Sequence, residues 1–342
     1  MKVGIVGTGM IVRMVAPNMR SWGIDVVAVA GTPASMNEVN ELADEYGAAG
    51  RYDDYKKLVA DPEVDTVYVA VPNFLHYAVS EAALKAGKDV VCEKPLASNF
   101  REAERLAAVA REEGRFLWEA VVTTRQPNFK LVRDELLPRI GTVKVVTVNY
   151  SQYSSRYDAF RAGEVLPAFD PTKAGGAIMD LGLYTLTYTI GLFGAPVRAT
   201  YLPNIERGID TSGIALLEYD GFRAVNVCAK DCGAPSVMQI QGTDGYIVSN
   251  SQPNVCGGVT LHLNDGTEVG FDKKGNWLKV DCNMSTVPAS LIPAPIAAYV
   301  KANFPGQPIK QIKKERYGYE VELTSDIELK FNKAGELIGM DD

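Results

Sequence analysis

The amino-acid sequence predicts an α/β chain. It has a doubly wound parallel sheet, then an open, mostly antiparallel sheet, then a C-terminal repeat of a helix with antiparallel strands. Strand and helix signals alternate to about residue 120, and strand signals dominate from Thr142. A pattern at Leu263–Asp281 recurs at Leu323–Asp341, 60 residues later. Alternating β and α segments with short links are typical of a doubly wound sheet. We therefore expect three regions: 1–120, 121–258 and 259–342.

The composition is that of a globular chain with room for two or three cores. It has 342 residues, 46% of them hydrophobic and 23% charged, and a net charge of −7. The acidic balance argues against nucleic acid or an anionic membrane as a partner. No apolar run approaches the ~18 residues that span a bilayer. The N-terminus lacks a secretory signal pattern, so we expect a cytoplasmic protein.

The five cysteines do not indicate a metal site. Cys228 and Cys232 lack zinc-ribbon spacing, and the chain contains two histidines. We therefore expect free buried thiols in a reducing compartment, and no bound metal.

The chain opens on a strand–turn–helix signature. Val3–Val6 is apolar, β-branched and followed by glycine, which predicts a buried parallel strand. Gly7 permits a tight turn and Gly9 lets the backbone approach a pyrophosphate, while a helix opening at Met10 points N–H groups at that charge. Val12 replaces the third glycine of the G-x-G-x-x-G pattern, and a chance glycine-rich turn is the alternative. The predicted dinucleotide-binding residues are Gly7, Thr8, Gly9, Met10 and Ile11.

The other expected elements follow from hydrophobic periodicity. In the first region we expect strands at 25–30, 66–71 and 89–92, and helices at 37–46, 76–86 and 100–113. Asn99 is placed to cap the last helix, with Glu102 at the spacing of a capping box. In the second region we expect strands at 142–150, 214–219, 223–228 and 236–242, and a helix at 184–193.

The end of the second strand bears on the choice of cofactor. A carboxylate there favours NAD, because it binds the ribose hydroxyls. Here the strand runs into Gly31 and Thr32 without an acid. Thr32 can hydrogen-bond a 2′-hydroxyl or a 2′-phosphate, and no arginine follows directly. NADP and NAD both stay open, with a slight preference for NADP.

Two further segments lie at the carboxyl ends of predicted strands, where such sheets bind ligands. One contains Pro72, Asn73 and His76, and the other contains Glu93 and Lys94 followed by proline. A lysine between a buried strand and a proline is held at the edge of the sheet. The alternative for Lys94 is a solvated loop residue.

These motifs carry a resemblance. GTGMI, AVPNFLH and KAGKDVVCEKPLA resemble the Gfo/Idh/MocA oxidoreductase family. Downstream, FDP and GGAIMDLGLY resemble its second signature. Tyr184 stands where many members have histidine, as in the branch of dihydrodiol dehydrogenases, xylose dehydrogenases and glucose–fructose oxidoreductase. The resemblance extends to about residue 252. It implies an NAD(P)-binding Rossmann domain over 1–120 and an α/β substrate and sheet domain over 121–258.

The implied activity is hydride transfer between nicotinamide and a CH–OH group of a sugar, cyclic polyol or dihydrodiol. Such a reaction needs a group that takes the hydroxyl proton. An ammonium near a phenol lowers the phenol pKa. We therefore expect Tyr184 as general acid/base, Lys94 as its electrostatic partner, and Asp180 as an orienting residue one helical turn earlier. The alternatives are a core aromatic for Tyr184 and a helix-start acid for Asp180.

The resemblance also places His76 beside the nicotinamide ribose. Arg156, Tyr157 and Arg161, in the loop before the Gly-Gly motif, are candidate substrate residues, and surface charge is their alternative. The family pattern is not kept after Glu119-Ala120. Val122 and Thr124 stand where relatives often have tryptophan and arginine, which predicts an unusual substrate.

The C-terminal repeat predicts two hairpins with a helix between them. Phe271 aligns with Phe331, and Gly275 with Gly335. Pro293–Phe304 is amphipathic and ends at Pro-Gly. This region resembles PepSY-like repeats of small proteins with a β-lactamase-inhibitor-like fold. The first repeat lacks a preceding helix, and the family's own closing helix and strand are absent.

Two explanations of this C-terminus stay open: the repeat substitutes for the closing elements, or the chain is a fusion. We expect a weak joint near 253–263. Two other functions also stay open, a nucleotide-binding protein without catalysis and a C-terminal binding or inhibitor module. Family relatives commonly pair through the open sheet, so a homo-oligomer is possible.

Overall fold

The computed structural model describes residues 1–283 and 285–341. The chain forms two compact units. The first unit comprises 1–121, 155–180 and 205–211, and the second comprises 122–154, 181–204 and 212–342. No helix within the described ranges is long and apolar enough to cross a membrane.

The first unit is built on a parallel sheet with the strand order β3-β2-β1-β4-β5-β6. Its strands are β1 (Lys2–Val6), β2 (Asp25–Ala30), β3 (Gly50–Tyr52), β4 (Thr66–Val69), β5 (Asp89–Cys92) and β6 (Leu117–Glu119). The chain order reverses between β1 and β4, so the carboxyl ends of these two strands flank the crevice where such sheets bind ligands. The doubly wound sheet predicted from the sequence is confirmed.

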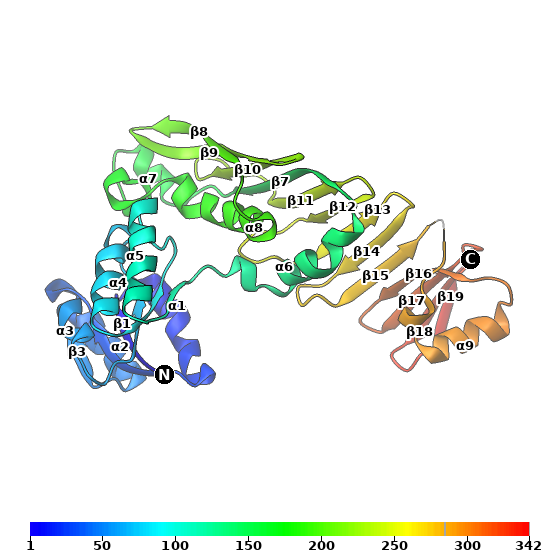
Figure 1. Ribbon diagram of the computed structural model, residues 1–342. Coiled ribbons are helices and arrows are strands. Elements are labelled where there is room, and N and C mark those ends of the chain that lie inside the picture. The colour runs from blue at the N-terminus through cyan, green and yellow to red at the C-terminus, as the bar shows by residue number, and fades with distance from the viewer. Residues whose placement is uncertain (284, 342) are drawn as a thin grey trace. The chain divides into compact units, whose positions relative to one another are not determined.

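Helices cover both faces of this sheet (Figure 1). They are α1 (Met10–Met19), α2 (Met36–Tyr46), α3 (Tyr55–Val59), α4 (His76–Lys85) and α5 (Phe100–Glu112), and α7 (Tyr157–Arg161) also belongs to the first unit. Val12 and Leu42 pack in one core, and Leu84 and Leu106 pack in the other. The Asn99 side chain caps α5 by accepting the Glu102 N–H at 3.1 Å. The Glu102 carboxylate accepts the Ser98 N–H, not that of Asn99, so the reciprocal bond of a capping box is shifted by one residue.

The second unit is built on a sheet of thirteen strands in the described residues. The strands are β7 (Val143–Ser151), β8 (Arg198–Glu206), β9 (Ile209–Tyr219), β10 (Phe222–Ala229), β11 (Val237–Gly242), β12 (Gly245–Ser249), β13 (Val259–Leu263), β14 (Thr267–Phe271), β15 (Trp277–Cys282), β16 (Ile309–Lys314), β17 (Gly318–Leu323), β18 (Glu328–Asn332) and β19 (Leu337–Asp341). Its order is β19-β18-β17-β16-β15-β14-β13-β12-β11-β7-β10-β9-β8, and the pair β7–β10 is parallel. The helices are α6 (Pro127–Leu131), α8 (Leu183–Phe193) and α9 (Ala294–Asn303).

Sequence analysis missed several elements: β3, α3, β6, α6, α7, β8, β12, β13 and β16. β3 and α3 have three and five residues, which is too short to show a period. β8 is an edge strand that is largely exposed, so it lacks the alternation of a half-buried strand.

The C-terminal repeat folds as predicted. β14–β15 and β18–β19 are hairpins, and each has a register shift just before its phenylalanine, Phe271 or Phe331. α9 covers the second copy, because Ile296 and Val300 share a core with Phe331. The sheet continues from β12 into β13 without a break, so the repeat extends the sheet of the second unit.

The first copy is covered by a helix from elsewhere in the chain. Phe129 on α6, and Val132 in the π-helical turn Val132–Leu136 that follows it, share a core with Leu261 of β13. Val269 and Phe271 pack against the same core. α6 therefore occupies the position that α9 has in the second copy, which explains why no helix precedes the first repeat.

Candidate functional site

The glycine turn joins β1 to α1 as the sequence predicts. Gly7 has φ +121°, and a Cβ there would lie 2.2 Å from the Ala70 carbonyl oxygen, so only glycine fits. A Cβ on Gly9 would meet open space, which leaves its backbone accessible to a ligand. Gly9 is the N-cap of α1, and no side chain of the described residues caps this helix. Val12, at the third-glycine position, is fully buried. The turn thus presents backbone N–H groups at the crevice, as a pyrophosphate site requires.

The end of β2 presents two hydroxyl groups. The Thr32 N–H donates to Ser35 Oγ at 2.8 Å, and the two hydroxyl oxygens lie 3.1 Å apart. Gly31 is needed here because a Cβ would lie 2.4 Å from Ser35 Oγ. Sequence analysis found Gly31 and Thr32 but missed Ser35, which the T-x-x-S spacing of a cap could have indicated.

His76 connects the two loops at the carboxyl ends of β4 and β5. It is buried, with Nδ1 2.6 Å from the Pro95 carbonyl oxygen and Nε2 2.9 Å from the Val71 carbonyl oxygen. One ring nitrogen donates to a carbonyl oxygen in either neutral tautomer, so the ring links the Val71 and Pro95 backbones. His76 therefore supports the Lys94–Pro95 turn through the backbone.

Two carboxylates hold the same turn. The Tyr68 hydroxyl donates to Glu93 Oε1 at 2.6 Å, and the Leu96 N–H donates to Glu119 Oε1 at 2.9 Å. Burial, together with the bond to Glu93, raises the pKa of Tyr68. Burial also raises the pKa of Glu119. Sequence analysis named Glu93 but gave no role to Tyr68 or Glu119, because only the fold brings these strand ends together.

Lys94 forms an ion pair with Asp180. Its Nζ lies 2.9 Å from Asp180 Oδ1 and 3.3 Å from the Asp180 carbonyl oxygen. Asp180 is in a π-helical turn, Ile178–Gly182, that precedes α8. The expected α-helical turn between Asp180 and Tyr184 is therefore not present, because π-helical bonds run from i to i+5. Such turns are frequent at functional sites.

The Gly175–Gly176 pair lets the segment before Asp180 pack closely. A Cβ on Gly175 would lie 2.7 Å from the Pro167 carbonyl oxygen. Gly176 has φ +112°, and its Cβ would lie 2.0 Å from Asp210 Oδ1. Asp210 in turn accepts the Ile178 N–H at 2.8 Å. Sequence analysis missed Asp210, which lies 30 residues after Asp180 in the sequence.

Tyr184 is on α8, in the second unit. It is half-buried, and its ring centroid lies 6.0 Å from that of Tyr150 on β7. Lys230 directly follows β10, whose last residue pairs with Ser151 of β7. Lys230 is 2% exposed, which is rare for a lysine. Sequence analysis did not single it out, since burial was not visible in its local pattern.

The three candidate substrate residues have different surroundings. Arg156 lines a cavity of about 170 Å³ together with Pro72, Asn73, Pro167, Ala168, Lys173, Gly175 and Asp180. The Tyr157 hydroxyl donates to Glu206 at 2.7 Å, and its ring packs on Phe160 and Phe169. Arg161 is exposed, and neither Tyr157 nor Arg161 lines this cavity. The fold thus brings Arg156, Asn73 and Asp180 to one place.

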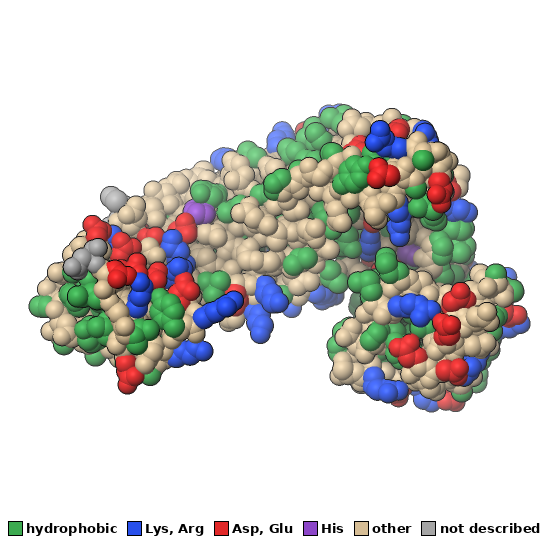
Figure 2. Space-filling model, turned by 180° about the vertical axis from the view of Figure 1, so that it is seen from behind, with side chains coloured by type: hydrophobic (Ala, Val, Ile, Leu, Met, Phe, Trp, Pro, Cys, Tyr) green, Lys and Arg blue, Asp and Glu red, His purple; other side chains and the backbone are tan. Residues whose placement is uncertain are grey.

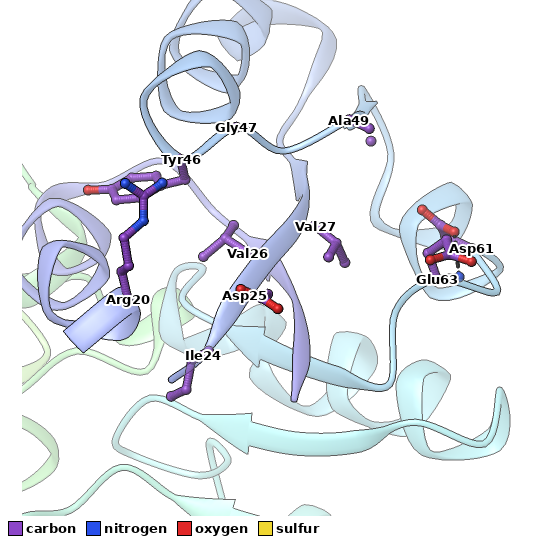
Figure 3. A pocket seen from close by; sticks show the side chains of 11 residues that line it. Arg20, Ile24, Asp25, Val26, Val27, Tyr46, Gly47, Ala49, Asp61 and Glu63 are labelled. Carbon is purple, nitrogen blue, oxygen red and sulfur yellow. Dashed lines mark hydrogen bonds between the residues drawn. The ribbon is translucent and has the colours of Figure 1, made fainter. Parts of the chain in front are cut away.

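A larger cavity of about 350 Å³ lies at the other end of the parallel sheet. Figure 3 shows Arg20 and Tyr46 on one side of it and Asp61 and Glu63 on the other. Asp25, the first residue of β2, also lines it. Because doubly wound sheets bind ligands at the carboxyl ends of their strands, this amino-end cavity is not part of the candidate site. The described residues contain no cluster of three or more side chains that could hold a metal ion.

Family models match three stretches of the chain. A model described as an oxidoreductase family with an NAD-binding Rossmann fold matches residues 1–121. A GFO/IDH/MocA C-terminal domain matches 138–248, and a putative beta-lactamase-inhibitor-like, PepSY-like model matches 258–339. Both resemblances stated from the sequence are confirmed.

Individual relatives extend over most of the chain. It is 42% identical to scyllo-inositol 2-dehydrogenase (NADP(+)) of Bacillus subtilis over 239 residues, 69% of this chain and 70% of that protein. It is 30% identical to trans-1,2-dihydrobenzene-1,2-diol dehydrogenase of Mus musculus, over 71% of this chain and 72% of that protein. A 3-ketoreductase from Actinomadura kijaniata, solved with NADP and TDP-benzene, has a TM-score of 0.71 at 24% identity, with 81% of this chain and 85% of that chain covered. That structure supports the fold.

Proposed function

Because the chain belongs to the Gfo/Idh/MocA family of NAD(P)-binding oxidoreductases, we propose that it transfers a hydride between NADP and an alcohol carbon of a sugar, cyclic polyol or dihydrodiol. The observation that carries the proposal is the Lys94–Asp180 ion pair at the carboxyl end of β5. The relatives of known substrate act on an inositol, on xylose and on a dihydrodiol, as their names state.

The residues divide the chemistry between them. Bound nicotinamide supplies the hydride acceptor. In this proposal Tyr184 takes the hydroxyl proton of the alcohol, and an ammonium brought near a phenol lowers the phenol pKa. Lys94 is the proposed source of that ammonium and of a hydrogen bond to the substrate oxygen. Asp180, 2.9 Å from Lys94 Nζ, fixes the position of the ammonium group.

Two substitutions test these roles. Lys94→Ala and Tyr184→Phe are each expected to lower kcat by about 10²–10⁴-fold, the range that general acid–base catalysis contributes. Turnover is measured with scyllo-inositol, D-xylose and trans-1,2-dihydrobenzene-1,2-diol. Tyr317→Phe, which changes an exposed tyrosine of the C-terminal repeat, is the matched control. Unchanged turnover in both site variants contradicts the proposal.

The preference for NADP rests on the end of β2 and on the relatives. No carboxylate follows this strand, and the hydroxyls of Thr32 and Ser35 are placed together at its end. We expect NADPH to quench protein fluorescence at lower concentration than NADH. Thr32→Ala is expected to weaken NADPH binding about tenfold, as loss of a hydrogen bond to a charged group does. Tighter binding of NADH contradicts the preference. Binding of a cofactor without turnover of any substrate favours a non-catalytic nucleotide-binding protein.

The open face of the central strands supports a homodimer. Val145, Ile214 and Leu216 lie on one face of β7 and β9, and each is between 37% and 40% exposed. Charged side chains also gather over the C-terminal strands of the second unit (Figure 2). Arg223 and Glu218 lie at one end of the same face, 3.8 Å apart, so opposite charges offset each other there. A face with exposed aliphatic groups is suited to pairing with a second copy. Leu216→Lys is expected to convert a dimer to a monomer in sedimentation, and a wild-type monomer contradicts the homodimer.

The cytoplasmic location stays a prediction, which cell fractionation tests.

A further inference from the structure

The cavity beside Asp180 has more basic than acidic groups in its wall. Its lining contains two cations, Arg156 and Lys173, and one carboxylate, Asp180. Asp180 already forms the ion pair with Lys94. The remaining polar lining is the Asn73 side chain, whose Nδ2 donates to the Ala174 carbonyl oxygen at 2.9 Å. A ligand that brings negative charge to this cavity would meet Lys173 and Arg156 in its wall.

Lys173 makes no ion pair at this wall in the described residues, and Asp170 is the carboxylate that interacts with it at longer range. Its Nζ lies 4.1 Å from the centroid of the Phe74 ring, and no carboxylate of the described residues lies within 4.0 Å of it. A ring quadrupole attracts the ammonium but leaves its charge in place. Asp170, three residues earlier, accepts the Thr172 N–H at 2.8 Å and the Thr172 hydroxyl at 2.7 Å. Lys173 is half-buried, so an anion bound here meets a cation that is partly shielded from water.

The elements that carry these groups come from two places in the sequence. Asn73 and Phe74 follow β4, at the carboxyl end of the parallel sheet. Lys173 and Arg156 belong to the 155–180 segment of the same unit. The Asn73–Ala174 hydrogen bond and the Lys173–Phe74 contact join the two places, so the cations are positioned against the sheet edge that bears Lys94.

We propose that the substrate carries an anionic group, a carboxylate or a phosphate, that Lys173 and Arg156 bind while the reacting alcohol lies at Lys94. This inference rests on the proposed function, since it names the substrate class of the same site. An acidic sugar or a sugar phosphate has this chemistry. Lys173 is proposed to determine substrate specificity. It takes no part in the hydride transfer or in the proton transfer to Tyr184.

The first test compares three substrates that differ in charge: D-glucose, D-glucuronate and D-glucose 6-phosphate, each with saturating NADP. The two acids distinguish a carboxylate from a phosphate. We expect kcat/KM for at least one acid to exceed that for D-glucose by about tenfold or more, as a hydrogen bond to a charged group provides. Lys173→Gln is expected to reduce this ratio to near one by raising KM for the acid, and Lys173→Arg is expected to keep most of it. Lys130→Gln, at an exposed lysine of α6, is the matched control and keeps the ratio.

A second measurement separates this inference from the proposed function. Titration calorimetry of the NADP complex measures binding of D-glucuronate and D-glucose 6-phosphate whether or not turnover occurs. Binding of either acid that weakens about tenfold in Lys173→Gln supports the inference even if no substrate reacts. Turnover of D-glucose with equal kcat/KM for all three compounds overturns it and leaves the oxidoreductase proposal intact. Binding of neither acid, or an equal effect of Lys173→Gln on the acids and on D-glucose, also overturns it.

Discussion

The two copies of the C-terminal repeat have the same hairpin but different covering helices. The turn glycines Gly275 and Gly335 have φ +82° and +84°. A Cβ on Gly275 would face Asn128 and Leu131 of α6, and a Cβ on Gly335 would face Pro295 and Ile296 of α9. Both hairpins thus rest their turns on a helix. In the second copy the helix is part of the repeat, and in the first it comes from residues 127–131.

The difference shows that the hairpin sequence specifies strand register but does not specify which helix packs on the hairpin. A hairpin alone is marginally stable in water, and it needs a packed face. The second copy has a core around Phe331 that only β15 of the first copy joins, through Val280 and Cys282, whereas Phe271 of the first copy packs against the core beneath α6. The first copy therefore completes the sheet of the oxidoreductase, and the second is added at its edge.

The largest expected effect comes from the equivalent phenylalanines. Phe331 is fully buried, and Phe271 is partly exposed. Phe331→Ala is expected to lower the free energy of unfolding of the second copy by about 3–5 kcal/mol, because it leaves a cavity in a closed core. Phe271→Ala is expected to cost less, because its side chain is already partly in water. Hydrogen exchange of segments 259–283 and 309–341 measures the loss of stability in each variant.

The same experiment also shows which segments lose protection in each variant. Loss of protection after Phe331→Ala is expected in 294–341 and in β15, because Val280 and Cys282 lie in the same core as Phe331. Phe271→Ala is expected to expose amides of α6 and β13 as well, because they share its core. A uniform loss over both copies in either variant contradicts the assignment of Phe271 and Phe331 to different cores.

A smaller effect is expected at the joint between α6 and the first copy. Asn128 is buried, and its Nδ2 lies 3.3 Å from the Cys256 carbonyl oxygen and 2.8 Å from that of Asp272. It also donates to the Gly257 carbonyl. Asn128→Ala removes the side-chain donor from the Cys256 and Gly257 carbonyls, whereas the Asp272 carbonyl still accepts the Gly275 N–H at 3.0 Å. We therefore expect a loss of about 1–3 kcal/mol. Asn303→Ala, at an exposed asparagine of α9, is the control.

Limited proteolysis tests whether Asn128 stabilises the segment 253–263, where the sequence predicts a weak joint. If Asn128 secures the joint, cleavage there is expected to accelerate in Asn128→Ala relative to the wild type and to Asn303→Ala. Equal cleavage in all three contradicts a role for Asn128. Preferential cleavage of the wild type at this joint supports the weakness predicted from the sequence.

The hairpins were predictable because their information is local. The pattern around Phe271 and Phe331 contains strand alternation and a turn glycine within about twenty residues. The cover by α6 was not predictable, because it joins residues 127–136 to 259–271 across more than a hundred residues of chain. The same limit explains why the missing helix looked like a truncated repeat in the sequence.

The candidate site shows the same division. The glycine turn and Lys94 could be located from strand ends and glycines, which are local signals. The partners of Lys94, His76 and Gly176 could not, since Asp180, Pro95 and Asp210 meet them only in the folded chain. The π-helical turn at Asp180 also left no mark in the hydrophobic periodicity.

The bridging lysine lies on different strands of the two hairpins, and its replacement is expected to change stability least. In each hairpin two carboxylates lie directly opposite, Glu268 with Asp281 and Glu328 with Asp341. A lysine bridges each pair, but from opposite strands, because Lys279 faces Gly270 whereas Lys330 faces Gly339. The glycine opposite each lysine leaves room for the long side chain to reach both acids. The copies thus keep the charge pattern while exchanging the residues that provide it.

Replacing the bridging lysine of the first copy, Lys279→Ala, leaves two like charges opposite each other. We expect a loss of about 0.5 kcal/mol at neutral pH, the range for a partly exposed pair. Burial lowers the pKa of Lys279, but hydrogen bonds to Asp281 and Glu268 outweigh it and raise the pKa above its ordinary 10.5. The contribution of the lysine is therefore complete below pH 10.5 and is lost as the pH rises through the higher pKa of the folded state. Urea unfolding at pH 8 and above pH 10.5 measures the difference in free energy of unfolding between the wild type and Lys279→Ala. This difference is expected to narrow at the higher pH.

A double variant that moves the lysine, Lys279→Gly with Gly270→Lys, reproduces the arrangement of the second copy and is expected to restore the lost stability. No restoration indicates that the two hairpins are not interchangeable.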